Sequence, residues 1–198
     1  MADMSLFPTY TPRDDEEERI QSLIERVQLD GTPRALLLYG EGGVGKSYLL
    51  RYLSDRLTLD NVVYVGPIDV DDAEYWSTTN LNHFVAEKLT QGTYFQNYKA
   101  FLVKMPEVER EKMGHETVLA HLRKANRAFV TDYQNFIQHS GLTPVLIFDT
   151  VEAIRGTDTL TRLLLWVKKL PGTLFILAGR PVKEIVDPVA RELGEHPR

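Results

Sequence analysis

The stretch ALLLYGEGGVGKSYLLRYL, residues 35–53, decides the fold of this 198-residue chain. Residues 35–39 form a short apolar run closed by Gly40, which predicts a buried β-strand. Residues 45–57 follow with their leucines spaced for one face of a helix. Between the two lies a turn of the form G-x-x-x-x-G-K-S. The sequence therefore predicts a strand, a tight glycine-rich loop and a helix in direct succession.

This loop has the residue types that phosphate binding requires. Glycines let the backbone adopt positive φ and turn its N–H groups toward phosphate oxygens, and a helix N-terminus adds the positive end of its dipole. We expect Lys46 to reach the β- and γ-phosphates and Ser47 to ligate Mg²⁺, with ATP or ADP as the nucleotide. A glycine-rich turn that binds nothing is the alternative, and the flanking strand and helix argue against it. The expected nucleotide contacts are Gly40, Glu41, Gly42, Gly43, Val44, Gly45, Lys46, Ser47 and Tyr48.

Apolar strands alternate with helical patterns along the rest of the chain. Further strands are predicted at residues 62–65, 145–148 and 174–177. Apolar spacing predicts helices after the acidic run 14–18, around 81–89, at 116–138, around 160–167 and after 185, with a less regular helical pattern in 92–114. This alternation predicts an α/β fold with a parallel sheet covered on both faces.

Two strand ends carry residues suited to phosphate chemistry. Asp149 closes the run 145–148 and is expected to hold Mg²⁺ opposite Ser47. Glu152 follows three residues later and could orient or deprotonate the attacking water, or could lie on the surface of the next helical turn. Arg180 ends the last strand, where it could sense the γ-phosphate or could instead pair with Glu184 one helical turn later. We expect Lys46, Asp149, Glu152 and Arg180 to form the catalytic set.

Composition restricts the other classes of function. The chain has no cysteine, and its five histidines lack paired ligand spacing, so disulfides and a zinc site are not expected. No apolar run approaches the roughly 20 residues of a membrane span, and we expect a cytoplasmic protein. The net charge of −5 argues mildly against nucleic acid as a partner. The aromatic residues of 94–101 are expected to form local core rather than to stack on bases.

Taken together, these motifs resemble the STAND-type NTPases, a signal-transduction branch close to AAA+ proteins. The resemblance covers roughly residues 10–185 and rests on TPRDDE at 11–16, GEGGVGKS, LIFDT and ILAGR. It implies a three-layer α/β/α P-loop NTPase, with Arg13 near the adenine or sugar of the nucleotide and Arg180 as a sensor. Pro12 stands where the first box usually has Gly, and Thr150 replaces the second acid that many members carry, so slow hydrolysis is expected.

Four classes of function follow from the motifs and the resemblance. The leading one is a regulatory switch, in which an ATPase module controls other domains of a longer, self-associating protein. A small-molecule kinase is the first alternative, but it would need clustered lid arginines, and Arg123 and Arg127 are predicted to share one helix face. A DNA-associated AAA+ loader and an inert ATP-binding scaffold are the others.

The family sheet order, 5-1-4-3-2, needs a fifth strand that the sequence does not show. We expect a single domain over residues 1–198, comprising an N-terminal segment and helix (1–30), a nucleotide-binding core (35–180) and a C-terminal helix (181–198). The strand at 35–39 would then lie at a sheet edge, and the chain would stop before the family's helical lid. An isolated module of this kind is expected to bind nucleotide, to hydrolyse it slowly and to be mostly monomeric.

Overall fold

A computed structural model describes residues 14–90, 94–110 and 115–193. Its strands are β1 (Arg34–Tyr39), β2 (Val62–Asp69), β3 (Thr143–Asp149) and β4 (Leu174–Gly179). Its α-helices are α1 (Asp14–Asp30), α2 (Lys46–Arg56), α3 (Thr78–Thr90), α4 (Gln96–Arg110), α5 (His115–Ser140), α6 (Asp158–Lys169) and α7 (Lys183–Leu193), and the 3₁₀ turns η2 (Ala73–Trp76) and η3 (Val151–Ile154) complete the described part. No described helix is long and apolar enough to cross a membrane.

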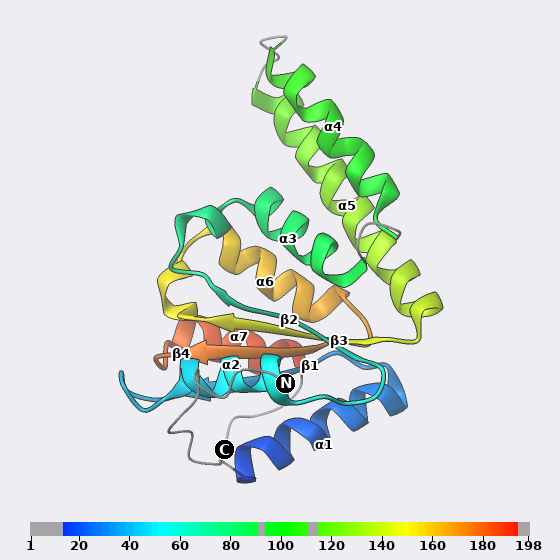
Figure 1. The fold of residues 1–198 in the computed structure, drawn as a ribbon. Helices are drawn as coiled ribbons and strands as arrows, with labels where there is room; N and C mark the ends of the chain where they lie inside the picture. The colour runs from blue at the N-terminus through cyan, green and yellow to red at the C-terminus, as the bar shows by residue number, and fades with distance from the viewer. Residues whose placement is uncertain (1–13, 91–93, 111–114, 194–198) are drawn as a thin grey trace.

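The four strands form one parallel sheet in the order β1-β4-β3-β2, which confirms the α/β prediction (Figure 1). β3 and β4 are buried along most of their length because helices cover both faces. Their side chains alternate between two clusters, so that Leu146 and Phe148 face one way while Val145 and Ile147 face the other. Within the described residues, β1 has no strand on its outer side, as the sequence predicts.

Two helical layers enclose the sheet, with α1 and α2 on one face and α3, α5, α6 and α7 on the other. The first layer buries Ile20, Ile24 and Val27 from α1. The second contains a run of stacked rings in which Phe129 lies 5.3 Å from Trp166 and 5.4 Å from Phe95, measured between ring centroids. The aromatic residues after 93 are therefore core, as expected, since Phe95 and Tyr98 are fully buried.

The second strand is longer than predicted. Gly66-Pro67 signals the end of a strand in the sequence, yet β2 continues to Asp69 through a bulge between Val65 and Ile68. Gly66 makes the bulge possible because its φ is 116° and a Cβ there would collide with the carbonyl oxygen of Ile147. The strand then resumes its pairing with β3.

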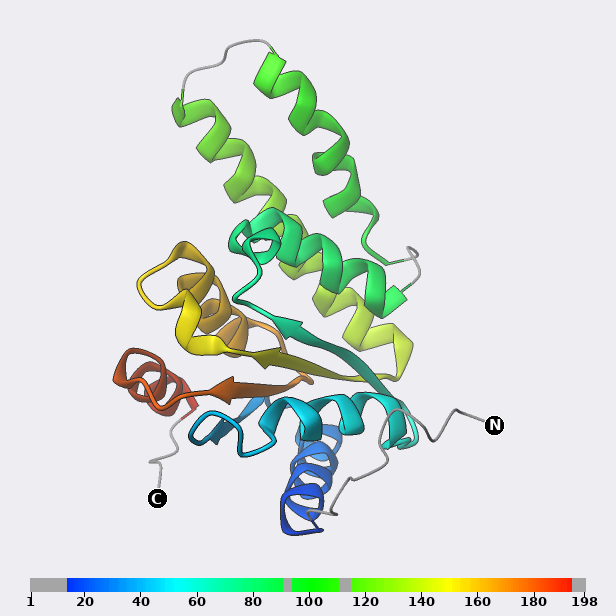
Figure 2. The ribbon, with the colours of Figure 1, turned by 60° about the vertical axis from the view of Figure 1, so that its left-hand side comes forward.

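Helices α4 and α5 form a hairpin that projects away from the sheet (Figures 1 and 2). The hairpin is anchored at its base by Asp132 of α5, which is fully buried. The Asp132 carboxylate accepts hydrogen bonds from the backbone N–H of Tyr98 (2.9 Å) and from Asn97 Nδ2 (2.7 Å) in the first turn of α4. One side chain of α5 thus caps a backbone N–H in the first turn of α4. α5 joins β3 at the amino end of that strand.

Candidate nucleotide-binding site

The candidate site lies at the carboxyl edge of the sheet, where parallel α/β sheets place their ligands. The strand register brings the relevant ends together, because Tyr39 of β1 pairs with Gly179 of β4 and Asp69 of β2 pairs with Asp149 of β3. A cleft of about 440 Å³ opens there. Its lining comes from the glycine-rich loop, the start of α2 and the ends of β3 and β4, and comprises Gly42, Gly43, Gly45, Lys46, Ser47, Tyr48, Arg51, Asp149, Thr150, Glu152, Gly179 and Arg180.

The glycine-rich loop has a backbone that only glycine adopts easily at two positions. Gly43 has φ 84°, and Gly45, which caps α2, has φ 87°. A helix N-terminus presents backbone N–H groups and the positive end of the helix dipole, and the first turn of α2 places both beside this loop, which suits an anion. The loop therefore fits a phosphate group by its backbone geometry as well as by its sequence.

The ammonium group of Lys46 lies over this loop. Its Nζ atom donates to the backbone oxygens of Gly40 (2.6 Å) and Glu41 (2.9 Å). Both acceptors of the Lys46 ammonium group are uncharged backbone carbonyls. A phosphate in the cleft would offer it a charged acceptor, which makes the stronger hydrogen bond.

Ser47 and Asp149 are the residues that fit a Mg²⁺ ion. Both line the cleft, Ser47 from the first turn of α2 and Asp149 from the end of β3. The Asp149 carboxylate accepts one hydrogen bond, from the backbone N–H of Thr150 (2.9 Å). A hydroxyl and a carboxylate are hard oxygen ligands of the kind Mg²⁺ prefers, and an ion shared with phosphates needs only one or two of them from the protein.

Glu152 is turned toward the end of β4 and not out into solvent. Its Oε2 atom accepts a hydrogen bond from the backbone N–H of Arg180 at 3.0 Å, and its Oε1 atom lies 3.8 Å from Arg180 Nε. The side chain of Glu152 is 26% exposed, whereas that of Arg180 is 69% exposed. The hydrogen bond to the Arg180 backbone is thus less exposed to solvent than the contact with the Arg180 guanidinium.

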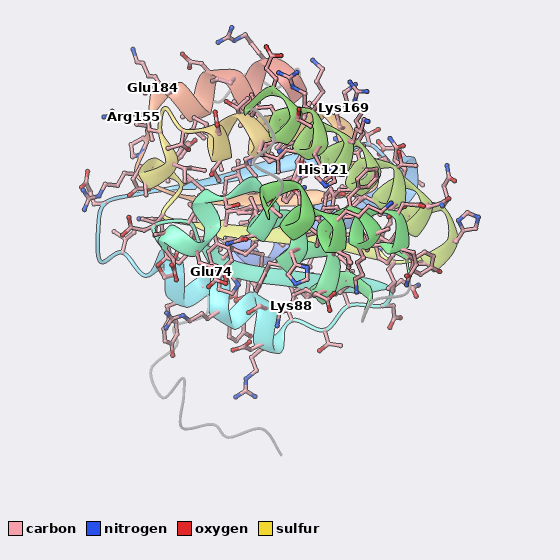
Figure 3. The ribbon with its side chains drawn as sticks, turned by 90° about the horizontal axis from the view of Figure 1, so that it is seen from above. Glu74, Lys88, His121, Arg155, Lys169 and Glu184 are labelled. Atoms are coloured by element: carbon pink, nitrogen blue, oxygen red, sulfur yellow. The ribbon has the colours of Figure 1, made fainter. Side chains whose placement is uncertain are left out.

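Arg180 does not pair with Glu184. The carboxylate of Glu184 lies 3.9 Å from Arg155 Nη1, and Figure 3 shows these two side chains next to each other. The Arg180 guanidinium reaches toward the glycine-rich loop, where its Nη2 atom is 3.7 Å from the position that a Cβ would take on Gly42. Arg180 therefore contacts Glu152, and its guanidinium lies in front of the glycine-rich loop near Gly42.

Thr150 has a left-handed backbone, with φ 58° and ψ 37°. This conformation is rare for a β-branched residue, and such residues concentrate at functional sites. It turns the chain sharply after Asp149 and starts η3, so Glu152 reaches the cleft from the turn that follows the strand.

The structure gathers most of the expected site residues at one cleft, and three of them occupy other positions. Gly40 and Glu41 contact Lys46 through their carbonyls, and Val44 is exposed at the outside of the loop. Arg13 lies outside the described residues.

Sequence reasoning missed three lining residues: Arg51, Thr150 and Gly179. Arg51 could have been found, since it follows Ser47 by four residues and so shares its face of α2. Among the described residues, no group of three His, Asp or Glu side chains has the arrangement of a metal site.

Comparison with known proteins points to one family. The family model described as an AAA ATPase domain matches residues 11–176. Over 56 residues the chain is 39% identical to a putative ORC1-type DNA replication protein 1 of Thermoplasma acidophilum, a match that covers 28% of this chain and 16% of that protein. A solved structure of Drosophila ORC bound to AT-rich DNA and Cdc6 resembles the fold with a TM-score of 0.47 and 9% identity, over 94% of this chain and 60% of that one. The chain thus spans less than two thirds of each of these relatives.

Proposed function

The chain belongs to the AAA ATPase domain family, and from that premise we propose that it is an MgATP-dependent regulatory switch that binds ATP and hydrolyses it slowly. The observation that carries the proposal is the meeting of Lys46, Ser47, Asp149, Glu152 and Arg180 at one cleft. These residues come from the loop after β1, the turn after β3 and the end of β4. Lys46 and Arg180 are thus available to the phosphates of a bound triphosphate, and Ser47 and Asp149 to its Mg²⁺ ion.

The chemistry proposed for this cleft is transfer of the γ-phosphoryl group to water. Lys46 and the loop amides would hold the β- and γ-phosphates, and Ser47 and Asp149 would hold Mg²⁺, which neutralises charge on the phosphate oxygens. Glu152 would accept a proton from water as the water oxygen bonds to the γ-phosphorus and the bond to the ADP oxygen breaks. Arg180, beside the loop and beside Glu152, would contact the γ-phosphate and so distinguish ATP from ADP.

Binding and turnover by point variants test this proposal. Lys46→Ala should abolish ATP binding, while Lys169→Ala, which removes an exposed lysine of α6 outside the cleft, should leave it unchanged. Glu152→Gln should bind ATP normally and turn it over about 10²-fold more slowly, the scale of losing a general base. Glu184→Gln is the matched control for the loss of a carboxylate. Unchanged ATP affinity in Lys46→Ala would refute the assignment of the loop.

A DNA-associated ATPase is the second candidate, and the surface of α5 favours it. Arg123, Lys124 and Arg127 are exposed on that helix, and its one carboxylate between residues 117 and 139, that of Asp132, is buried. Cations interspersed with amide and hydroxyl side chains suit a phosphate backbone. Under this proposal duplex DNA should stimulate ATP turnover, and the paired variant Arg123→Ala with Arg127→Ala should remove the stimulation without changing basal turnover. If DNA has no effect at low salt, this candidate fails and the switch stands.

The small-molecule kinase fits the geometry less well. Arg123 and Arg127, the arginines that a phosphoryl-transfer lid would need, are on α5 and do not line the cleft.

A further inference from the structure

Gly179, the last residue of β4, lies against Glu152 more closely than a larger residue could. A Cβ built on Gly179 would overlap Glu152 Oε2, and it would lie 3.0 Å from Val151 Cγ2 and 3.2 Å from the backbone nitrogen of Val151. The last two contacts are tight, and a shift of a few tenths of an ångström would relieve them. The overlap with the Glu152 carboxylate is far deeper. The carboxylate therefore occupies the space that the missing side chain leaves.

The absence of a side chain at this position has a direct consequence for hydrogen bonding. Because Glu152 can approach the end of β4, its Oε2 atom reaches the backbone N–H of Arg180 at 3.0 Å. The Arg180 side chain adds a pair at 3.8 Å, but that side chain is 69% exposed, and solvent screens such pairs strongly. The backbone donor, fixed by the strand, is the contact that sets the position of the carboxylate.

We propose that Gly179 is a positioning residue for Glu152. Its lack of a side chain lets the carboxylate dock on the Arg180 amide at the rim of the nucleotide cleft, where both residues line the space next to the glycine-rich loop. This inference rests on the proposed function in assigning Glu152 a role in turnover. Its structural part, the displacement of the Glu152 carboxylate by any larger residue at position 179, is independent of that role.

A set of four proteins tests the proposal: wild type, Gly179→Ala, Glu152→Ala and the double variant. Thermal unfolding without nucleotide is the first readout. We expect Gly179→Ala to lower the melting temperature by about 2–4 °C, because the new methyl group makes the Glu152 carboxylate move aside and give up its hydrogen bond to the Arg180 amide. Glu152→Ala removes the competitor, so in its background the same glycine substitution should cost less than half as much. Glu184→Ala, which removes a carboxylate elsewhere on the same side of the sheet, should give no such relief.

Turnover and nucleotide binding are the second readout. Gly179→Ala should lower kcat by at least tenfold while KM and the Kd for ATP change less than about threefold, since Lys46 and Ser47 are untouched. Added to Glu152→Gln, it should lower kcat by less than twofold, because the carboxylate that it displaces is already gone.

Several results would overturn the proposal. Melting temperatures that are additive across the set would show that Gly179 and Glu152 do not compete. Wild-type melting and kcat in Gly179→Ala would show that the space is not needed. Failure of both Gly179→Ala and the double variant to fold would mean that the backbone of Val151, and not Glu152, excludes the side chain. Failure of wild type to bind ATP would refute the proposed function but would leave the unfolding result to decide the packing of Gly179 against Glu152.

Discussion

Replacement of Asp132 by alanine should destabilise the protein through the base of the α4–α5 hairpin. The substitution leaves the backbone N–H of Tyr98 without an acceptor, and Tyr98 is fully buried. An orphaned buried donor costs about 1–3 kcal/mol, and this range includes the loss of the helix cap, because the cap is the same hydrogen bond. The bond to Asn97 adds little because Asn97 is exposed and can turn to water. We therefore expect a loss of about 2 kcal/mol, or a fall of about 4–8 °C in Tm for a chain of this size.

Circular dichroism during heating measures this fall in Tm, and two further variants test whether it comes from the lost hydrogen bond. Asp132→Asn keeps an acceptor for the Tyr98 amide and should cost about 1 kcal/mol. Thr131→Ala, at the exposed neighbouring position on α5, should change Tm by less than about 2 °C. The Kd for ATP should stay within about twofold in all three, because none of these residues lines the cleft. A Tm for Asp132→Ala within 2 °C of wild type would refute the reasoning that this carboxylate holds α4.

Three further predictions concern the cleft and the sheet. Thr150→Gly should stabilise the protein by about 1 kcal/mol in urea unfolding, because glycine adopts the left-handed backbone without the strain that threonine carries; a loss of stability would argue against strain at this turn. Arg51→Ala should weaken ATP binding by about three- to tenfold, and more at low salt, because a cation is removed from the rim of the cleft; equal loss at all salt concentrations would contradict an electrostatic role. Burial raises the pKa of both Tyr39 and Tyr64 to about 12, above the usual value of 10.0. The fold therefore disfavours the tyrosinate form, so the stability that these groups contribute is complete below pH 10 and falls as the pH rises from 10 to 12; Tyr64→Phe should lose less stability than wild type over that range.

The sheet and the phosphate loop could be predicted because each strand and the loop are specified by a few consecutive residues. A strand of a parallel sheet is buried on both faces, so 145–148 and 174–177 read as apolar runs, and the glycine spacing of the loop is local. The length of β2 could not be predicted. Gly66-Pro67 normally ends a strand, and the bulge that carries the strand past it depends on the neighbouring carbonyl of Ile147.

The sequence predicted the two helices of the hairpin but not their packing against each other, for a similar reason. α4 packs mainly on α5 and not on the sheet, so its apolar side chains follow a partner that lies elsewhere in the chain. The capping of α4 by Asp132 joins residues 34 positions apart, and nothing in the local pattern of either segment indicates it. The buried aromatic residues of 94–98 were the usable signal, and they predicted core without predicting its partner.

The order of strands explains why the end of β4 matters most to the cleft. β4 lies between β1, which leads into the glycine-rich loop, and β3, which leads to Asp149 and Glu152. A residue at its end can therefore touch both sides, and Arg180 does: its guanidinium approaches Gly42 while its backbone amide donates to Glu152. An anion held by the loop would compete with Glu152 for the same guanidinium. A change in phosphate occupancy can thus reach the carboxylate through one residue, and the backbone hydrogen bond, which needs the space at Gly179, keeps that carboxylate in place when the side-chain contact is lost.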